Sequence, residues 1–197
     1  MAAHAGSRIV IDRIPDHIEA PRLTIRRWRA DDAEAVCAAI TASVDHLRPW
    51  MPWAAGEPIG ADARRALIEN WNVEWEAGGD LHAGMFLADE VIGGAGLHRR
   101  RGPHGLEIGY WVHIDHTRSG YASEVAAALT TTAFAIEAVD RVEIHHDKAN
   151  VASAGVPRRL GFSTLPEMLK DVMAPAEIGI DCGWVMSRST WLRRAER

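Results

Sequence analysis

The chain has 197 residues, of which 47% are hydrophobic and 25% are charged, as is usual for globular proteins. This length favours one domain with a sizeable core over two very small ones. The net charge of −5 argues against a general nucleic-acid binder, because such proteins normally carry a basic stripe. The one basic run, Arg99–Arg101, is best explained as a solvated turn. No segment approaches the ~18 apolar residues that span a membrane, so neither nucleic acid nor a membrane is expected as a partner.

The first twenty residues contain no continuous apolar segment of the kind found in secretory signals. Residues 1–20 are therefore interpreted as an N-terminal extension and residues 21–197 as a single domain. The two cysteines, Cys37 and Cys182, fit neither a CxxC pattern nor a metal-binding spacing. Both are expected to be reduced, in a cytoplasmic protein.

The first half of the domain combines one strand with two helices. Residues 23–28 alternate as a strand does, and a helix is predicted to begin near Asp31, which has an acidic residue three positions later. Residues 46–53 (HLRPWMPW) contain two prolines, which break regular structure. A second helix is predicted over 62–76, where large apolar residues recur every fourth position.

The second half of the domain is predicted to contain three successive strands, followed by helices that alternate with strands. In chain order these are strands at 82–88, 91–98 and 106–112, a helix at 121–139, a strand at 141–146, a short helix from Asn150 to Gly161, and a strand near 183–187. This order indicates an α/β fold whose sheet is mixed in direction and has helices on both faces.

The segment Leu106–Glu124 runs from a strand through a short polar loop into a helix. The N–H groups of a first helical turn lack partners inside the helix, and the helix dipole attracts anions. Gly120 removes the Cβ where a phosphate must approach the backbone, while Arg118 and Ser119 can add hydrogen bonds. The segment predicts a phosphate-binding loop, although an ordinary capped turn has the same pattern. The P-loop and Rossmann motifs are both absent from the sequence.

Six stretches follow one another in a characteristic order: PRLTIRRWRADDAEAV (21–36), HLRPWMPWA (46–54), VIGGAGLH (91–98), LEIGYWVHIDHTRSGYASE (106–124), RVEIHHDKANVAS (141–153) and RRLGF (158–162). Together they resemble the GNAT superfamily of acyl-CoA-dependent N-acyltransferases, and within it the RimJ/RimL-like branch. The resemblance implies an α+β GNAT fold with a mostly antiparallel sheet of about six or seven strands. It also implies acetyl-CoA as the donor and a primary amine as the acceptor.

The resemblance implies that the loop binds the CoA pyrophosphate, mainly through backbone amides. The matching residues are Thr117, Arg118, Ser119, Gly120, Tyr121, Ala122 and Ser123. Thr117 stands where the family usually has Gln or Arg, so weakened binding is expected, with Arg118 as a compensating group. The backbones of Tyr110 and Val112 would lie beside the pantetheine arm. Asn150 would bond a pantetheine amide, and a local Asx-turn is the competing explanation for it.

Acyl transfer from a thioester to an amine needs a base, a stabilised oxyanion and a proton for the departing thiolate. Glu107 is flanked by apolar residues, which predicts a raised pKa and a role as the base. An outward-facing residue or a structural salt bridge is an equally good explanation of Glu107. The resemblance implies that Ser153 protonates the thiolate, since Pro157 replaces a tyrosine common in the family. Helix capping is the alternative role for Ser153.

The resemblance implies that the proline-broken segment lies on the acceptor side, where Trp50 and Trp53, together with Trp111, could shape a pocket. Attack is expected to be direct, in a ternary complex, because neither cysteine lies in a motif. The histidine spacings match no metal motif, so no metal is expected.

Three questions stay open at this stage. The acceptor is a protein N-terminus or a small-molecule amine. The donor is acetyl-CoA or another acyl-CoA such as succinyl-CoA, and a non-catalytic CoA-binding module is a rival from another class. A homodimer is compatible with the branch, without an independent signal in the sequence.

Overall fold

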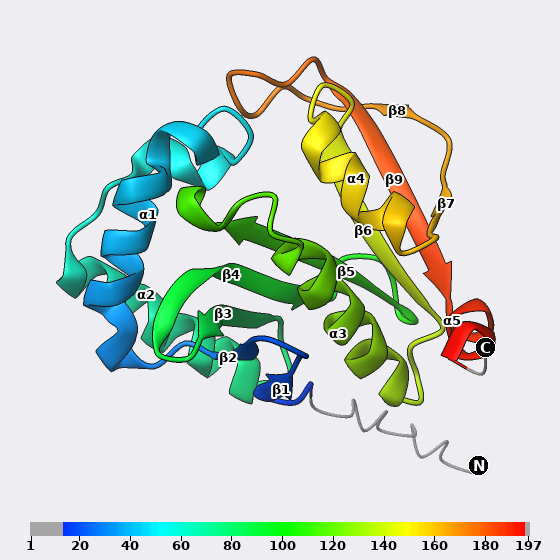
Figure 1. Ribbon diagram of the computed structural model, residues 1–197, viewed down its shortest axis with the longest axis horizontal. Helices are drawn as coiled ribbons and strands as arrows, with labels where there is room; N and C mark the ends of the chain where they lie inside the picture. The colour runs from blue at the N-terminus through cyan, green and yellow to red at the C-terminus, as the bar shows by residue number, and fades with distance from the viewer. Residues whose placement is uncertain (1–13, 196–197) are drawn as a thin grey trace, which may run out of the picture.

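The computed structural model describes residues 14–195, which fold around one nine-stranded sheet (Figure 1). The strands are β1 (His17–Glu19), β2 (Thr24–Arg27), β3 (Leu81–Leu87), β4 (Glu90–His98), β5 (Gly105–Val112), β6 (Arg141–Asp147), β7 (Ser163–Thr164), β8 (Met168–Leu169) and β9 (Ile180–Ser187). The α-helices are α1 (Ala33–Leu47), α2 (Ala61–Glu76), α3 (Tyr121–Ala135), α4 (Val151–Arg159) and α5 (Arg188–Ala195). Short 3₁₀ helices η1 (Ala30–Asp32), η2 (Pro52–Gly56) and η3 (Ile114–His116) lie in the connections.

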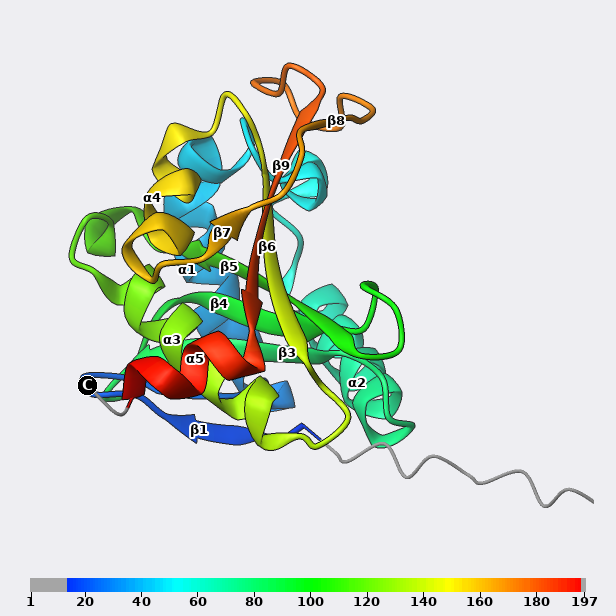
Figure 2. The same ribbon diagram turned by 90° about the vertical axis from the view of Figure 1, so that its right-hand side faces the viewer.

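The strand order along the sheet is β1-β2-β3-β4-β5-β6-β9-β7, with β8 pairing to β9. Paired strands run antiparallel except β5 and β6, which are parallel. Helices α2 and α3 lie on opposite sides of the sheet (Figure 2). The predicted mixed, mostly antiparallel α/β fold is thus confirmed. The sheet has more strands than expected because β1, β7 and β8 have two or three residues each, too few to show a period in the sequence.

Two clusters of buried side chains hold the helices to the sheet. The larger contains Leu129 of α3 and Met85 of β3, and the smaller contains Val36 of α1, Ile68 of α2 and Phe86 of β3. Met85 and Phe86 are neighbours in one strand, and successive side chains point to opposite faces. The two clusters therefore cover the two faces of the sheet.

Part of the segment expected to be an N-terminal extension contributes to this core. Strand β1 pairs with β2, and Ile14 is buried in the larger cluster. Residues 1–13 lie outside the described range. Within that range, no helix is long and apolar enough to cross a membrane.

Helix α3 is shorter than predicted, because it ends at Ala135 rather than at residue 139. The backbone of Ile136 is extended. The Arg188 guanidinium donates to the carbonyls of Glu137 and Val139, at 3.0 Å in each case. A residue from the far end of the domain therefore binds the carbonyl groups that follow the helix, and the local sequence contains no sign of this contact.

The pairing of β5 with β6 positions the functional site. Only Gly105–Glu107 of β5 pair with Arg141–Glu143 of β6, whereas β4 pairs with β5 as far as Val112 and β9 pairs with β6 as far as Asp147. Beyond the paired residues the two strands diverge (Figure 1). One side of residues 108–112 therefore faces a gap instead of a neighbouring strand.

Asp147 fastens the end of β6 to the segment that leads into β9. Its side chain is buried, and its two oxygens accept hydrogen bonds from the backbone N–H groups of Ala149, Ile178, Gly179 and Ile180 at 2.9–3.3 Å. Burial acts to raise the pKa of Asp147, but these hydrogen bonds and Lys170 outweigh it, and the pKa lies below its usual value. A charged carboxylate thus stabilises this wall of the gap.

We predict that Asp147→Asn lowers the free energy of unfolding by about 2–3 kcal/mol, because an amide NH₂ group would face backbone N–H donors that need an acceptor. Chemical denaturation checks this value. The control is Asp140→Asn, which changes an exposed acid just before β6 and should alter stability by less than about 0.5 kcal/mol. Equal effects of the two substitutions would contradict the role given to Asp147.

Candidate active site

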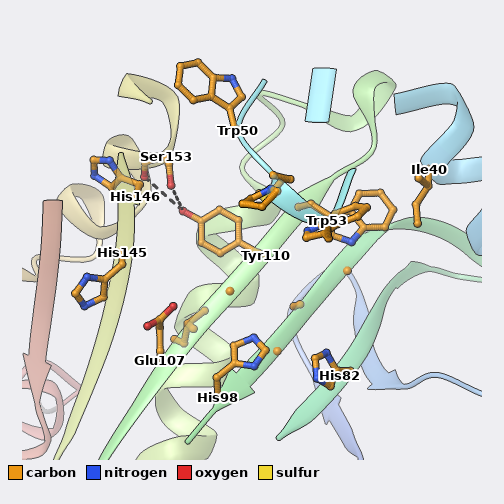
Figure 3. A pocket seen from close by; sticks show the side chains of 18 of the residues that line it. Ile40, Trp50, Trp53, His82, His98, Glu107, Tyr110, His145, His146 and Ser153 are labelled. Carbon is orange, nitrogen blue, oxygen red and sulfur yellow. Dashed lines mark hydrogen bonds between the residues drawn. The ribbon is translucent and has the colours of Figure 1, made fainter. Parts of the chain in front are cut away.

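Two cavities meet in the gap between β5 and β6. The first, of about 820 Å³, lies beside residues 116–122 and α4, and we name it the loop cavity. The second, of about 840 Å³, lies among residues 50–59, α2 and strands β3–β6, and we name it the tryptophan cavity (Figure 3). The residues that line both cavities are Trp50, Met51, Tyr110, Trp111, Asn150 and Ser153. A ligand in each cavity would therefore meet the other at these residues.

Most of the residues predicted to bind a cofactor do line the loop cavity. They are Tyr110, Val112, Thr117, Arg118, Gly120, Tyr121, Ala122, Asn150 and Ser153. Ser119 and Ser123 are not part of this lining. The Ser119 carbonyl accepts a hydrogen bond from Arg22, and the Ser123 hydroxyl accepts one from Arg159. Both residues therefore stabilise the loop and the start of α3 without lining the cavity.

The loop has a backbone shape suited to an anion. Arg118 and Gly120 both adopt left-handed conformations, with φ of 58° and 87°. Alternation of such residues turns successive N–H groups toward one point, and the first turn of α3 follows directly. Thr117 does not point at this cradle, because its hydroxyl donates to the carbonyl of Ile114 at 2.9 Å. The cradle therefore depends on backbone groups and not on the side chain at position 117.

Arg22 holds this loop in place from a distant part of the chain. Its Nε donates to a carboxylate oxygen of Glu124 at 2.7 Å, its Nη2 donates to the carbonyl of Ser119 at 3.1 Å, and its guanidinium lies 4.5 Å from the centre of the Tyr121 ring. The sequence alone did not indicate Arg22, because the contact spans about one hundred positions.

Arg159 is a second functional candidate missed from the sequence. It lines the loop cavity from the end of α4 and donates from Nε to the Ser123 hydroxyl at 3.1 Å. Together with Arg118 it provides positive charge beside the backbone cradle. These residues fit the phosphates of CoA.

Tyr110, Asn150 and Ser153 form the junction of the two cavities. Asn150 caps α4, since its side-chain oxygen accepts the Ser153 N–H at 3.1 Å. Ser153 is therefore not the capping group, and its hydroxyl lies 3.2 Å from the Tyr110 hydroxyl, as Figure 3 shows. Burial raises the pKa of Tyr110 to about 12, so the phenol stays protonated.

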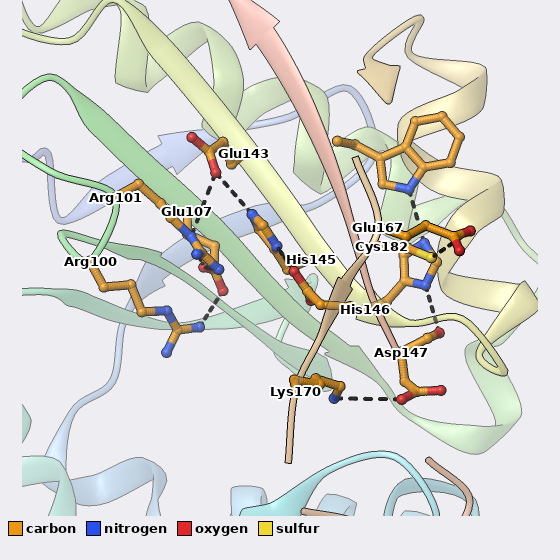
Figure 4. A network of polar contacts seen from close by, with 12 residues as sticks. Arg100, Arg101, Glu107, Glu143, His145, His146, Asp147, Glu167, Lys170 and Cys182 are labelled. Carbon is orange, nitrogen blue, oxygen red and sulfur yellow. Dashed lines mark hydrogen bonds and ion pairs between the residues drawn. The ribbon is translucent and has the colours of Figure 1, made fainter. Parts of the chain in front are cut away.

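Glu107 lines the tryptophan cavity, but the expected raised pKa is wrong. Its carboxylate forms ion pairs with Arg100 and Arg101 (Figure 4). Burial acts to raise the pKa of Glu107, but hydrogen bonding and charge from Arg100, with further charge from Arg101 and His145, outweigh burial and hold the pKa below its usual value. The residues next to Glu107 in the strand are apolar and give no sign of these two arginines. Arg100 and Arg101 belong to the basic run 99–101, for which the sequence predicts a solvated turn.

The arginines also reduce the repulsion between two neighbouring carboxylates. Glu107 and Glu143 are directly paired across β5 and β6, where two carboxylates repel one another. Arg101 bridges them, with Nε 2.6 Å from Glu107 and 3.7 Å from Glu143. Glu143 also contacts Arg141 at 3.0 Å and His145 at 2.9 Å. The positive charges of these arginines thus offset the two carboxylates and stabilise the end of the pairing between β5 and β6.

Aromatic rings form much of the wall of the tryptophan cavity. Trp50, Trp53 and Trp111, which were predicted to shape the acceptor side, all line this cavity, and the rings of Trp53 and Trp111 lie 6.2 Å apart. Trp71, which packs against the smaller buried cluster, lines this cavity too, and its ring stacks on that of His82 with the ring centres 4.7 Å apart.

His82, His98 and Asp80 are the one group among residues 14–195 with the spacing of metal ligands. Asp80 contacts His98 Nδ1 at 2.8 Å and accepts the backbone N–H of Arg99 at 2.7 Å. Burial, with a contribution from the charge of His98, lowers the pKa of His82 to about 4. The hydrogen bonds to His98 and to the Arg99 backbone account for the position of Asp80 without a metal ion. The neutral His82 ring forms part of the wall of the tryptophan cavity.

Comparison with known proteins assigns the family. The family described as "Acetyltransferase (GNAT) domain" matches residues 22–163. The chain belongs to the GNAT acetyltransferase family. This confirms the predicted family, the enzyme class of acyltransferase and acetyl-CoA as the donor. The roles of individual site residues stay predictions.

Individual relatives support the resemblance to the RimJ/RimL-like branch. The chain is 29% identical over 142 residues, 71% of its own length and 77% of the relative, to YdaF of Bacillus subtilis (strain 168), a protein named for ribosomal N-acetyltransferase activity. RimL, a ribosomal L7/L12 alpha-N-protein acetyltransferase solved with CoA, matches with a TM-score of 0.78 at 18% identity, over 90% of this chain and 98% of that one. RimJ of Mycobacterium smegmatis, solved with CoA-disulfide, matches with a TM-score of 0.73 at 20% identity, over 92% and 93%.

We predict that Gly120→Ala weakens CoA binding by about tenfold, because a Cβ in the left-handed region costs about 1–2 kcal/mol and shifts the N–H cradle. The added Cβ would also lie 3.3 Å from Arg22 Nη2. Calorimetric titration with CoA measures the effect. Gly78→Ala is the matched control, since Gly78 has a φ of 86°, a methyl group added there would meet nothing within 4 Å, and the residue lies beyond α2. Equal losses of CoA affinity in both variants would contradict the assignment of the loop.

Proposed function

We propose that the chain transfers the acetyl group of acetyl-CoA to a primary amine bound in the tryptophan cavity, by direct attack in a ternary complex. The observation that carries this proposal is the meeting of the two cavities at Tyr110 and Ser153, in the gap between β5 and β6. A donor enters from the loop cavity and an acceptor from the opposite cavity. The amine then reaches the thioester without a covalent enzyme intermediate.

Residues of the gap supply the groups that this reaction needs. Acetyl-CoA supplies the thioester, and the β5 backbone beyond Glu107 offers N–H groups to its carbonyl oxygen. The Ser153 hydroxyl donates a proton to the departing thiolate, which leaves as the thiol of CoA, and Ser153 takes a replacement proton from solvent water. The Tyr110 phenol, 3.2 Å away, holds the Ser153 hydroxyl in position.

Glu107 acts on the amine from the tryptophan cavity. Its pKa is held low, so the carboxylate is ionised at neutral pH and does not carry the proton that a base must accept. We assign it the removal of the amine proton through water, and its ion pairs with Arg100 and Arg101 fix its orientation.

The acceptor is an amine, and the names of YdaF and RimL favour ribosomal-protein N-termini as one class to test. A small-molecule amine is the other class. A homodimeric assembly, a single domain over 21–197 and a cytoplasmic location stay predictions.

Glu107→Gln should lower kcat/KM for the amine by about 100-fold, because it removes the proton acceptor from the cavity wall. Steady-state kinetics over a panel of amines, including peptide N-termini, measures this effect. Glu143→Gln is the matched control: it removes a charge from the same cluster, but Glu143 is not part of the cavity lining. If both variants lose the same activity, Glu107 is a structural ion-pair partner and not a base.

Ser153→Ala should lower kcat by about 10- to 100-fold while the Kd for CoA changes less than twofold, because the hydroxyl acts on the leaving group. Single-turnover kinetics with thiol detection measures the acetyl-transfer step. Tyr110→Phe should have the smaller effect. A large loss in Tyr110→Phe beside an active Ser153→Ala would transfer the role of proton donor to Tyr110.

A further inference from the structure

Arg64 is a buried cation in the wall of the tryptophan cavity. It lies in the first turn of α2, and only 3% of its surface is exposed. Its Nη2 contacts the carboxylate of Glu57, whereas Nε is buried and has no hydrogen-bond partner among residues 14–195. Buried polar groups are nearly always hydrogen-bonded. The unpaired Nε–H therefore indicates an acceptor supplied by a ligand.

Glu57 cannot serve as that acceptor, because its other contacts hold it in place. One carboxylate oxygen takes the Arg64 Nη2, and the other accepts the N–H of Ile59 at 3.1 Å. The Glu57 carbonyl accepts Nη2 of Arg48 at 2.9 Å. The ion pair thus anchors the guanidinium and leaves its Nε edge without a partner.

The acidic groups of this cavity lining are all engaged elsewhere. Glu107 pairs with two arginines, Asp147 accepts four N–H groups, Glu177 contacts Lys170 and accepts two N–H groups, and Asp181 contacts His145 at 2.7 Å. An anionic group entering the cavity would find in Arg64 a donor that no protein group has taken.

We infer that the acceptor is a small amine that also carries an oxyanion, either carboxylate or phosphate, and that Arg64 donates from Nε to this group. The inference rests on the proposed acetyl transfer to an amine in this cavity. The volume of about 840 Å³ is that of a small-molecule site, and the tryptophans enclose the body of the ligand. A contact this deeply buried suits the end of a molecule better than a protein chain that continues into solvent.

The first experiment compares matched amines. Phenylalanine is paired with phenylalaninamide, and O-phosphoethanolamine with ethanolamine, so that one arm tests a carboxylate and the other a phosphate. At least one anionic amine should be acetylated with a kcat/KM tenfold or more above that of its neutral partner. A tetrapeptide with a free N-terminus is the third arm.

The second experiment removes the Nε donor while keeping the charge beside Glu57. Arg64→Lys should raise KM for the preferred anionic amine at least tenfold, and the ratio of kcat/KM for that amine to kcat/KM for its neutral partner should fall at least tenfold. Arg65→Lys is the control, because Arg65 is the next residue, is exposed and pairs with Asp62. If circular dichroism shows that Arg64→Lys does not fold, the double variant Glu57→Gln/Arg64→Gln replaces the ion pair with neutral amides and should lose the same preference.

Equal turnover of anionic and neutral partners would overturn the inference, as would a preference that persists in Arg64→Lys. A tetrapeptide preferred over every small amine would overturn it as well. If no amine is acetylated, the proposed function fails, and the inference is decided separately by tryptophan fluorescence titration in the presence of CoA. Phenylalanine or inorganic phosphate should then bind at least tenfold more tightly to the wild type than to Arg64→Lys. Equal affinities would overturn the inference.

Discussion

The parallel pairing of β5 with β6 stops at Glu107 and Glu143, where two carboxylates come to lie side by side. Arg101 bridges the two carboxylates, Arg100 pairs with Glu107, and Arg141 pairs with Glu143. This cluster fixes the point from which the strands diverge. Both cavities, their shared residues and the free edge of β5 lie beyond that point.

Each side of the gap is stabilised by contacts between distant segments. Arg22 and Glu124 hold the loop beside the loop cavity, while Asp147 holds the segment that leads into β9. Asn150 caps α4 and thereby brings Ser153 to Tyr110. Functional groups thus sit on elements that are rigidly packed or capped, and this arrangement keeps the junction of the two cavities open.

The sequence predicted the parts of the site that depend on local order. The segment Leu106–Glu124 contains the strand, the loop and the helix start as one continuous stretch, so residue order was enough to group the residues that line the loop cavity. The C-terminal end of α3 and the partners of Glu107 did not follow from residue order, because they depend on arginines brought in by the fold. Arg22 and Arg159 lie in two of the stretches that resemble the family, whereas Arg64 lies in none of them. In sequence, an arginine that supports a loop or is buried looks like any solvated one.

The charge state of Glu107 shows most clearly why the local sequence was insufficient. Its neighbours in the strand are apolar, which predicts a raised pKa, yet Arg100 and Arg101 fold back from the preceding turn and reverse the shift. A search for cations six or seven residues before the glutamate would have found them. Only the structure shows that the side chains of Arg100 and Arg101 reach the Glu107 carboxylate.

A crystal structure with a non-hydrolysable acetyl-CoA analogue would show whether donor and acceptor meet in the gap between β5 and β6, beside Tyr110 and Ser153. We expect the pyrophosphate at the N–H groups of Arg118–Ala122 and the sulfur within hydrogen-bonding reach of the Ser153 hydroxyl, with the acyl group directed toward the tryptophan cavity. A sulfur placed away from the gap, or an acyl group that does not face the tryptophan cavity, would contradict this expectation.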